Sequence, residues 1–270
     1  MYLQGLSLTL QISLVAIIIG IALGIAISMV KVSSPTSRRR ERPRFRGKTK
    51  SERQALRREY RLDIRTERRD RRAARKNALK AARENGFAAV IVLLIKWLFE
   101  FLLWLVLIFC NIYTTVIRGT PLMIQLLILY GFAWMPNGVI VAFLGFGLNS
   151  AAYVSETFRS GIQSVDGGQM EAARSLGLTR WQAMTSVVLP QAIKNVLPAI
   201  FNEFIVLVKE TSVAGYVAVN ELTKMANSIR NRTYDSVSLY AAALVYLLLT
   251  YILTQVLKVL ERRFRKSDRS

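Results

Sequence analysis

The fold of this chain is decided by residues 166–190, which read DGGQMEAARSLGLTRWQAMTSVVLP. Asp166 can cap the start of one helix, with a glutamine three residues later that can reach back to the cap, and Thr179 opens a second helix with the same spacing. Gly177 lies between them and can adopt the positive φ that ends a helix. We therefore expect two short helices that meet at a tight bend, and a second helix that gives way around Pro190.

Long apolar runs lie on both sides of this stretch and are typical of a membrane protein. Residues 6–30 carry no charge and are long enough to cross the ~30 Å hydrocarbon core of a bilayer. Gly20 and Gly24 within this run are four residues apart, which predicts a close helix–helix contact. The predicted crossings are residues 6–30, about 114–132, 139–158, about 192–215 and 237–259. The sequence thus predicts an all-α integral membrane protein with five transmembrane helices.

The net charge of +21 is concentrated in one segment, residues 31–86. This segment carries about twenty Lys and Arg against about seven Asp and Glu, so it cannot enter hydrocarbon and favours the cytoplasmic side. Residues 51–83 contain helix formers and no Pro or Gly, which predicts a charged helix without an apolar stripe. Three roles stay open: a solvated extension, binding to the anionic inner leaflet, and binding to nucleic acid, which the scarcity of aromatic residues disfavours.

The apolar tract 87–132 is long enough for one or two crossings, and the basic residues decide between them. Two crossings would place the basic residues around 159–194 outside, against the positive-inside bias. We predict one crossing centred on 114–132, with 87–110 as an interfacial helix on the cytoplasmic side or a tilted lead-in. The N-terminus is then outside, and the C-terminus and residues 166–190 are inside.

The composition also bears on chemistry. The chain has one cysteine, Cys110, so no disulfide framework is expected, and it has no histidine for general-base or metal chemistry. It has no phosphate-binding GxxxxGK[ST] loop. We expect no cofactor, no metal and no ATP hydrolysis by this chain.

Four ordered motifs resemble one family of membrane proteins. Glu171, Ala172, Ala173 and Gly177, then nine residues, then Val187 and Leu189-Pro190 resemble the EAA loop of ABC-importer permeases, with Val187 where that family usually has Ile. Three further motifs resemble its polar amino acid uptake branch: RGTPLMIQ (118–125), AAYVSETFRSGI (151–162) and KETS (209–212). The resemblance covers residues 6–30 and about 112–265.

The resemblance implies a type I ABC importer permease fold and a role as the membrane permease subunit of an ATP-driven importer of polar amino acids. The implied partners are a cytoplasmic ABC ATPase dimer, a second permease subunit in a homo- or heterodimer, and an extracellular or periplasmic solute-binding protein, together with membrane lipid. The implied location is the plasma membrane of a bacterium. The expected division is a first span at 1–30, a basic cytoplasmic insertion at 31–86 that the family pattern lacks, and a permease core at 87–270.

The resemblance assigns the coupling to the ATPase to a set within 166–190: Glu171, Ala172, Ala173, Gly177, Leu189 and Pro190. In that family this loop sits as a helix in a cleft of the ATPase. An ordinary amphipathic connector is the alternative.

Two further sets are candidates for moving or contacting the substrate. A cation, a flexible joint and a helix breaker follow one another at Arg118, Gly119, Thr120 and Pro121, which predicts a gating hinge or, equally, a simple helix start with an inner-face arginine. Polar residues expected in mid-span or on one helix face could line a substrate path: Asn149, Tyr153, Glu156, Asn202 and Glu203. Structural pairing or a polar seam between subunits is the alternative for these five.

One function from another class competes with transport. In it the spans only anchor the chain, and the basic residues 31–86 bind anionic lipid or nucleic acid.

Overall fold

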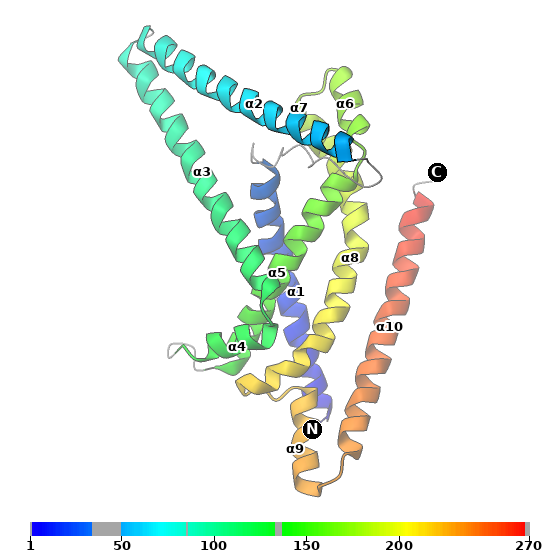
Figure 1. Cartoon of the computed structure of the whole chain (residues 1–270). Helices are drawn as coiled ribbons and strands as arrows, with labels where there is room; N and C mark the ends of the chain where they lie inside the picture. The colour runs from blue at the N-terminus through cyan, green and yellow to red at the C-terminus, as the bar shows by residue number, and fades with distance from the viewer. Residues whose placement is uncertain (1, 34–49, 85, 133–136, 268–270) are drawn as a thin grey trace. The chain divides into compact units, whose positions relative to one another are not determined.

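The computed structural model describes residues 2–33, 50–84, 86–132 and 137–267. The described residues are almost entirely helical and contain no strand, as the sequence predicts (Figure 1). The elements in chain order are α1 (Tyr2–Ser33), α2 (Lys50–Glu84), α3 (Phe87–Gly119), α4 (Leu122–Tyr130), α5 (Gly138–Ser164), α6 (Gly167–Ser175), α7 (Arg180–Ala183), the π-helix η2 (Met184–Val188), α8 (Leu189–Glu210), the 3-10 helix η3 (Thr211–Val217), α9 (Leu222–Thr233) and α10 (Val237–Ser267).

Five of the described helical stretches are long and apolar enough to cross a membrane, which confirms the predicted number. They are Tyr2–Val32, Phe87–Gly119, Gly138–Ser164, Arg180–Val217 and Val237–Arg262. The chain is therefore an all-α membrane protein that crosses the bilayer several times.

The second crossing differs from its prediction. Helix α3 runs without interruption from Phe87 to Gly119, and the nine-residue α4 follows as a separate helix. A continuous span centred on 114–132 is thus wrong, because Pro121 has no backbone N–H to donate and disfavours helical backbone at Thr120. Residues 87–110 are part of a candidate span and not a separate interfacial helix.

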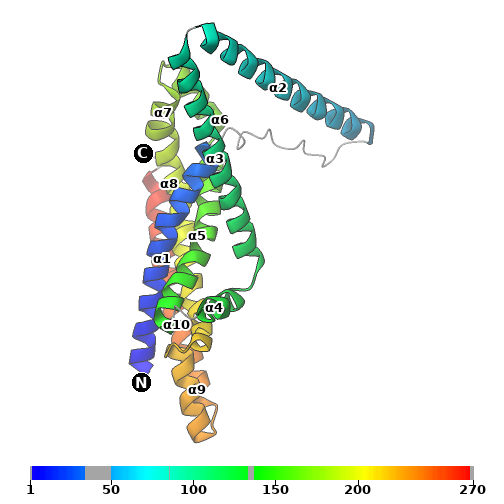
Figure 2. The same cartoon turned by 90° about the vertical axis from the view of Figure 1, so that its left-hand side faces the viewer.

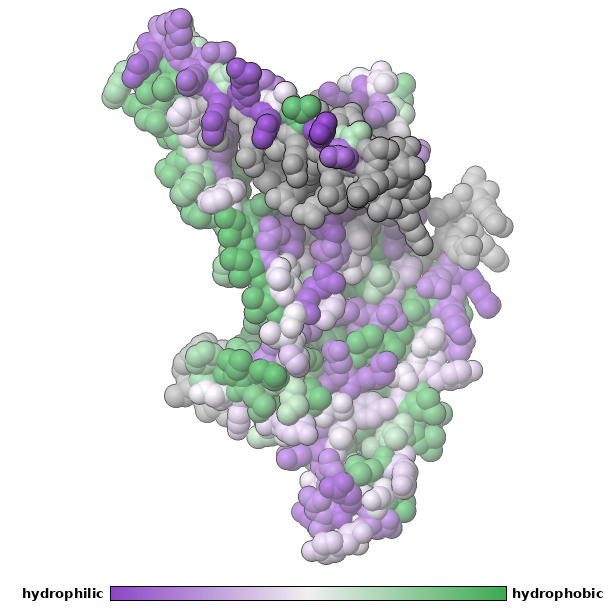
Figure 3. Space-filling view, in the orientation of Figure 1, coloured by the Kyte–Doolittle hydropathy of each residue, from purple (hydrophilic) through white to green (hydrophobic). Residues whose placement is uncertain are grey.

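The chain divides into two compact units. The larger unit joins Met1–Lys31 to Cys110–Ser270, and the smaller unit is Val32–Phe109. In the smaller unit the predicted charged helix is present as α2, and its described side chains are mostly exposed. Figure 3 shows hydrophilic residues along α2 and mainly hydrophobic ones along α3.

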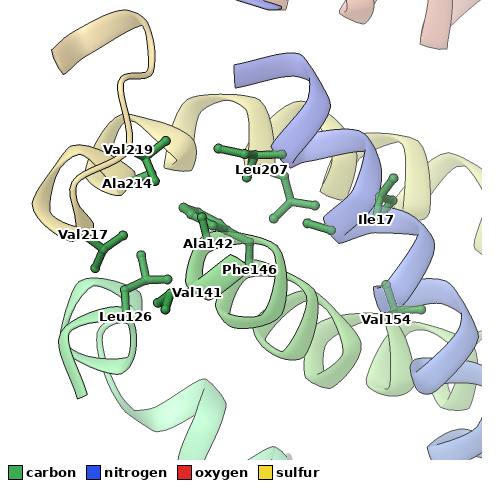
Figure 4. Close-up of a cluster of buried hydrophobic side chains, with 12 residues drawn as sticks. Ile17, Leu126, Val141, Ala142, Phe146, Val154, Leu207, Ala214, Val217 and Val219 are labelled. Atoms are coloured by element: carbon green, nitrogen blue, oxygen red, sulfur yellow. The ribbon is translucent and has the colours of Figure 1, made fainter. Parts of the chain in front are cut away.

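Helix α5 forms the centre of the larger unit. Its residues Val141, Ala142 and Phe146 are fully buried, and they pack in one cluster with residues of α1, α4, α8 and η3 (Figure 4). Twelve of the 27 residues of α5 are buried, among them Gly145, Gly147 and Ala151.

The contact between α1 and α5 is made through small residues, as the spacing of Gly20 and Gly24 predicts. A Cβ atom on Gly20 would lie 2.5 Å from Ser150 Oγ, and one on Gly24 would lie 2.7 Å from Val154 Cγ1. Side chains at these two positions would therefore force the helices apart.

The two ends of the larger unit carry different structures. The short helices α6 and α7 lie at one end, and the N-terminus and α9 lie at the other (Figures 1 and 2). At the second end Tyr2 Oη donates to the carbonyl of Ser238 at 3.1 Å, and Leu222 N donates to Thr9 Oγ1 at 3.4 Å. These two hydrogen bonds hold the N-terminal end of α1 against α9 and α10.

Candidate functional site

Residues 166–190 form a compact hairpin of two short helices, which we call the coupling hairpin. Asp166 Oδ1 accepts from Gly168 N at 3.0 Å and caps α6. Thr179 and Gln182 form a reciprocal capping box at the start of α7, with Thr179 N donating to Gln182 Oε1 at 2.8 Å. The predicted N-cap residue is confirmed for both helices, and the predicted reciprocal bond is confirmed for α7.

The bend between the helices has the predicted geometry. Gly177 has φ +87°, its N–H donates to Arg174 O at 3.1 Å, and Leu178 N donates to Ala173 O at 3.3 Å. This pair of bonds is a Schellman motif, which satisfies carbonyls at the end of α6 that would otherwise have no donor.

The predicted break at Pro190 is wrong. The second helix widens into the π-helix η2 and passes directly into α8, with Pro190 in the first turn of α8. Just before the proline, Leu189 N donates to Met184 O, five residues back, so the turn is widened and the helix continues without a bond from residue 190. The hairpin is consequently joined to the fourth candidate span by continuous helix.

The surface of the coupling hairpin includes most of the predicted residues. Glu171, Ala172, Gly177 and Pro190 are exposed, Leu189 is half-buried, and Ala173 is buried. Two exposed apolar side chains were not predicted: Leu176, 84% exposed, and Trp181, 75% exposed. The sequence pattern does not single them out, because Leu178 next to the same glycine is apolar and half-buried.

Residues 118–121 lie at the break between α3 and α4. Arg118 stacks on the ring of Tyr153, with Cζ 5.3 Å from the ring centroid, which is a cation–π contact. Tyr153 is in the middle of α5, so Arg118 lies beside the middle of the bundle and not at the end that carries the coupling hairpin. Pro121 has extended backbone and precedes α4.

The three candidate residues of α5 each have a different partner. Asn149 donates to Gln125 Oε1 at 3.1 Å, Tyr153 lies under Arg118, and Glu156 pairs with Arg159, whose Nε is 3.0 Å from Glu156 Oε2. The structure thus brings Asn149 and Tyr153 of α5 together with the α3–α4 break. The structure also places Gln125 in this group. Gln125 is the last residue of the 118–125 motif, and the sequence indicated no role for it.

Two other polar features come from α8 and α1 and border this group, because Glu203 interacts with Ser150 and Lys31 interacts with Glu156, both on α5. On α8, Asn202 is exposed and Glu203 is half-buried, since neighbouring residues of a helix point in different directions. Lys31 near the end of α1 is 7% exposed and its Nζ donates to Thr114 Oγ1 at 2.8 Å. Lys31 was missed because its partner is 83 residues away along the chain.

The sequence comparisons agree on one class of protein. Residues 85–266 match the family described as binding-protein-dependent transport system inner membrane component. The arginine transport system permease ArtQ of Bacillus subtilis is 40% identical over 164 residues, which are 58% of this chain and 75% of that protein. The protein named as a putative glutamine transport system permease in Rickettsia felis is 37% identical over 161 residues, which are 57% of this chain and 74% of that protein.

The solved structures support the same class. The crystal structure of an amino acid ABC transporter with histidines has a TM-score of 0.68 and 29% identity, over 97% of this chain and 93% of that one. An inward-facing MetNI methionine ABC transporter has a TM-score of 0.63 at 15% identity, over 97% of this chain and 95% of that one, and shows the same fold.

The matched residues 85–266 include the coupling hairpin, the α3–α4 break and four of the five candidate spans. The fold is that of a type I ABC importer permease, and the chain is a transport subunit and not an enzyme. The rival function, in which the spans only anchor a lipid- or nucleic-acid-binding segment, has no support in the comparisons. The chain belongs to the family of inner membrane components of binding-protein-dependent transport systems.

Proposed function

We propose that this chain imports polar amino acids as the permease subunit of an ABC importer in the plasma membrane of a bacterium. The named relatives are permeases for arginine and glutamine, and the solved structure with the higher TM-score is an amino acid transporter. The proposed partners are a cytoplasmic ATPase dimer, a second permease subunit and an extracellular or periplasmic solute-binding protein.

The observation that carries the mechanism is the surface of the coupling hairpin. Leu176 and Trp181 are exposed on a hairpin whose caps and bend are all hydrogen-bonded, at one end of the bundle. Large apolar side chains held rigidly at a surface are typical of a protein interface. The ATPase would take up these side chains and move the hairpin, and Glu171 would meet a basic group of the ATPase.

The remaining site residues complete the mechanism. Continuous helix from α7 through η2 into α8 carries the motion of the hairpin into the bundle. Residues 118–121 serve as the gating hinge. The substrate path is lined from α5 and α8 by Asn149, Tyr153, Glu156, Asn202 and Glu203. Residues 31–86 form a cytoplasmic extension of this permease.

Reconstitution tests the proposal. The permease is placed in vesicles with its ATPase and binding protein, and uptake of labelled polar amino acids, glutamine and arginine among them, is measured with and without ATP. We expect ATP-dependent uptake of at least one of them. We expect Trp181→Ala to reduce substrate-stimulated ATP hydrolysis by about tenfold or more, as for the loss of an interface anchor.

Two outcomes would contradict the proposal. Absence of uptake of any polar amino acid by an assembled, ATP-hydrolysing complex would exclude the substrate class. Full stimulation in the Trp181→Ala complex would exclude the hairpin as the coupling element. Tyr251→Ala, which removes an aromatic side chain 59% exposed in the middle of α10 and away from both ends of the bundle, is the matched control.

A further inference from the structure

The break between α3 and α4 leaves backbone carbonyls without their usual donors. In a regular helix the carbonyl of Ile117 would accept from the N–H of residue 121, which is a proline and has none. The carbonyl of Thr120 would accept from Ile124 N, which instead donates to Pro121 O at 3.1 Å. Two acceptors at the break therefore need another donor.

The side chain of Gln125 supplies that donor. Its Nε2 donates to Ile117 O at 2.8 Å and to Thr120 O at 3.0 Å, and Thr120 Oγ1 lies at 2.8 Å from the same nitrogen. The amide group thus closes the frayed end of α3 from the first turn of α4.

These contacts fix the orientation of the Gln125 amide. The two carbonyl oxygens can only accept, so the nitrogen must face them and Oε1 must face away. Oε1 then accepts from Asn149 Nδ2 of α5 at 3.1 Å. Asn149 is 4% exposed and Gln125 is half-buried, so this bond is partly buried between α4 and α5.

The next turn of α5 holds the other side of the break. Tyr153, four residues after Asn149, lies under the guanidinium of Arg118. Leu126, next to Gln125, is 1% exposed within the main buried cluster. The break is therefore fastened to two successive turns of the most buried helix.

We propose that Gln125 and Asn149 form an amide clasp that holds the α3–α4 break in one geometry against α5. Both are positioning residues for transport, and Asn149 acts through Gln125. The inference rests on the proposed role of residues 118–121 as the gating hinge. In this inference the clasp fixes the angle between the end of α3 and α4. A gating movement of residues 118–121 either keeps the hydrogen bonds that the Gln125 amide makes to Ile117, Thr120 and Asn149 or has to break them.

The polarity of the clasp gives variants that change its chemistry and not its volume. Gln125→Glu replaces the donating nitrogen by an oxygen that faces two carbonyl oxygens. Asn149→Asp places an acceptor against Gln125 Oε1. Both substitutions convert a hydrogen bond into a repulsive contact at constant size.

The experiment uses the full permease–ATPase complex in vesicles. It measures transport at varied concentrations of binding protein, and hydrogen exchange of the amides of residues 117–125. For Gln125→Glu and Asn149→Asp we expect a fall of about tenfold in the maximal transport rate with an unchanged half-saturating concentration of binding protein. We expect exchange to become faster at 117–125 and to stay unchanged in α8. The effects of Gln125→Ala and Asn149→Ala should be non-additive.

Gln54→Glu is the matched control, because Gln54 is exposed on α2 and the change in shape and charge is the same. Normal transport and normal exchange at 117–125 in both clasp variants would overturn the inference. Faster exchange confined to 117–125 with normal transport would overturn the positioning role. The exchange measurement does not depend on transport, so a complex that moves no amino acid would refute the proposed function while the clasp remains tested.

Discussion

Gly177 occupies the one position of the coupling hairpin that requires left-handed backbone. Its φ is +87°, and a Cβ atom there would have no neighbour within 4 Å. Any penalty for a side chain at this position therefore comes from the backbone alone, at about 1 kcal/mol for alanine.

Gly177→Ala tests whether that backbone matters for coupling. We expect substrate-stimulated ATP hydrolysis to fall severalfold, because the relaxed bend changes the angle between α6 and α7. The measurement is ATP hydrolysis by the reconstituted complex with and without loaded binding protein. Gly168→Ala lies in regular helix, where the nearest atom to the new Cβ is 3.6 Å away, and should have no effect. Equal activity of the two variants would show that the bend is not required.

Glu221 is a fully buried carboxyl that caps α9 at the opposite end of the bundle. Its two oxygens accept from Thr223 N and Lys224 N, each at 2.6 Å, and Tyr246 Oη donates to it at 3.1 Å. Burial raises the pKa of Glu221 above its ordinary value, and the hydrogen bonds from these donors oppose the shift.

This shift predicts how stability depends on pH. The folded chain keeps the Glu221 proton to higher pH than the unfolded chain, so the contribution of this group is present in full below the unfolded pKa. It is lost as pH rises through the raised pKa of the folded state. Thermal unfolding of the purified protein across this range should show a smaller loss of stability with pH in Glu221→Gln than in the wild type. Glu84→Gln, an exposed change on α2, should keep the wild-type slope, and an identical slope in Glu221→Gln would refute the assignment.

At the scale of elements, α1 and α5 touch through Gly20 and Gly24 with no room for a methyl group. We expect Gly20→Ala to destabilise the protein by about 1–3 kcal/mol through overpacking against Ser150. The measurement is the unfolding midpoint in detergent. Ala22→Leu adds a larger volume on the exposed face of the same helix and should leave the midpoint unchanged. If the unfolding midpoint of Gly20→Ala equalled that of the wild type, the two helices could move apart without any loss of stability.

The elements also show which features a sequence can predict. The caps at Asp166 and Thr179 and the bend at Gly177 were predicted correctly, because each depends on residues within one turn. The break expected at Pro190 was wrong, because the π-turn just before Pro190 lets the helix continue without the missing N–H. The effect of Pro121 was underestimated, since it divides the expected crossing into two helices.

The contacts that sequence reasoning missed are tertiary. Asn149 meets Gln125 across 24 residues, and Lys31 meets Thr114 across 83 residues. Periodicity placed Asn149, Tyr153 and Glu156 on one face of a helix, but it gives no information on which residues that face contacts. The exposed side chains of Leu176 and Trp181 depend in the same way on the packing of the hairpin.

At the scale of the whole molecule, the basic insertion of residues 31–86 belongs almost entirely to a separate unit from most of the permease core. The family match begins only at residue 85. We expect replacement of residues 34–84 by about twenty Gly and Ser residues, which reach up to ~65 Å, to leave transport within about twofold of the wild type. The measurement is uptake by the reconstituted complex. A loss of uptake with normal assembly of the complex would show that the basic insertion takes part in transport.

The orientation in the membrane gives a second prediction at this scale. With Cys110 replaced by serine, a cysteine at position 174 should react with an impermeant reagent only from the cytoplasmic side. A cysteine at position 234 should react only from outside. Both residues are exposed, and they lie on structures at opposite ends of the larger unit. If position 174 were labelled in intact cells, the topology would be the reverse of the one predicted, and contact of the hairpin with a cytoplasmic ATPase would be excluded.

The wide turn Met184–Val188 has a consequence for how the length of this region can vary. A π-turn is an α-helix that has gained one residue, so removing one residue there restores the ordinary spiral without rotating the rest of the helix. A single deletion within 184–188 should therefore preserve the rotational phase of α8, whereas the same deletion in the middle of α8 would turn every later side chain by about 100°. The joint between the hairpin and the membrane is thus where a one-residue change in chain length is best absorbed.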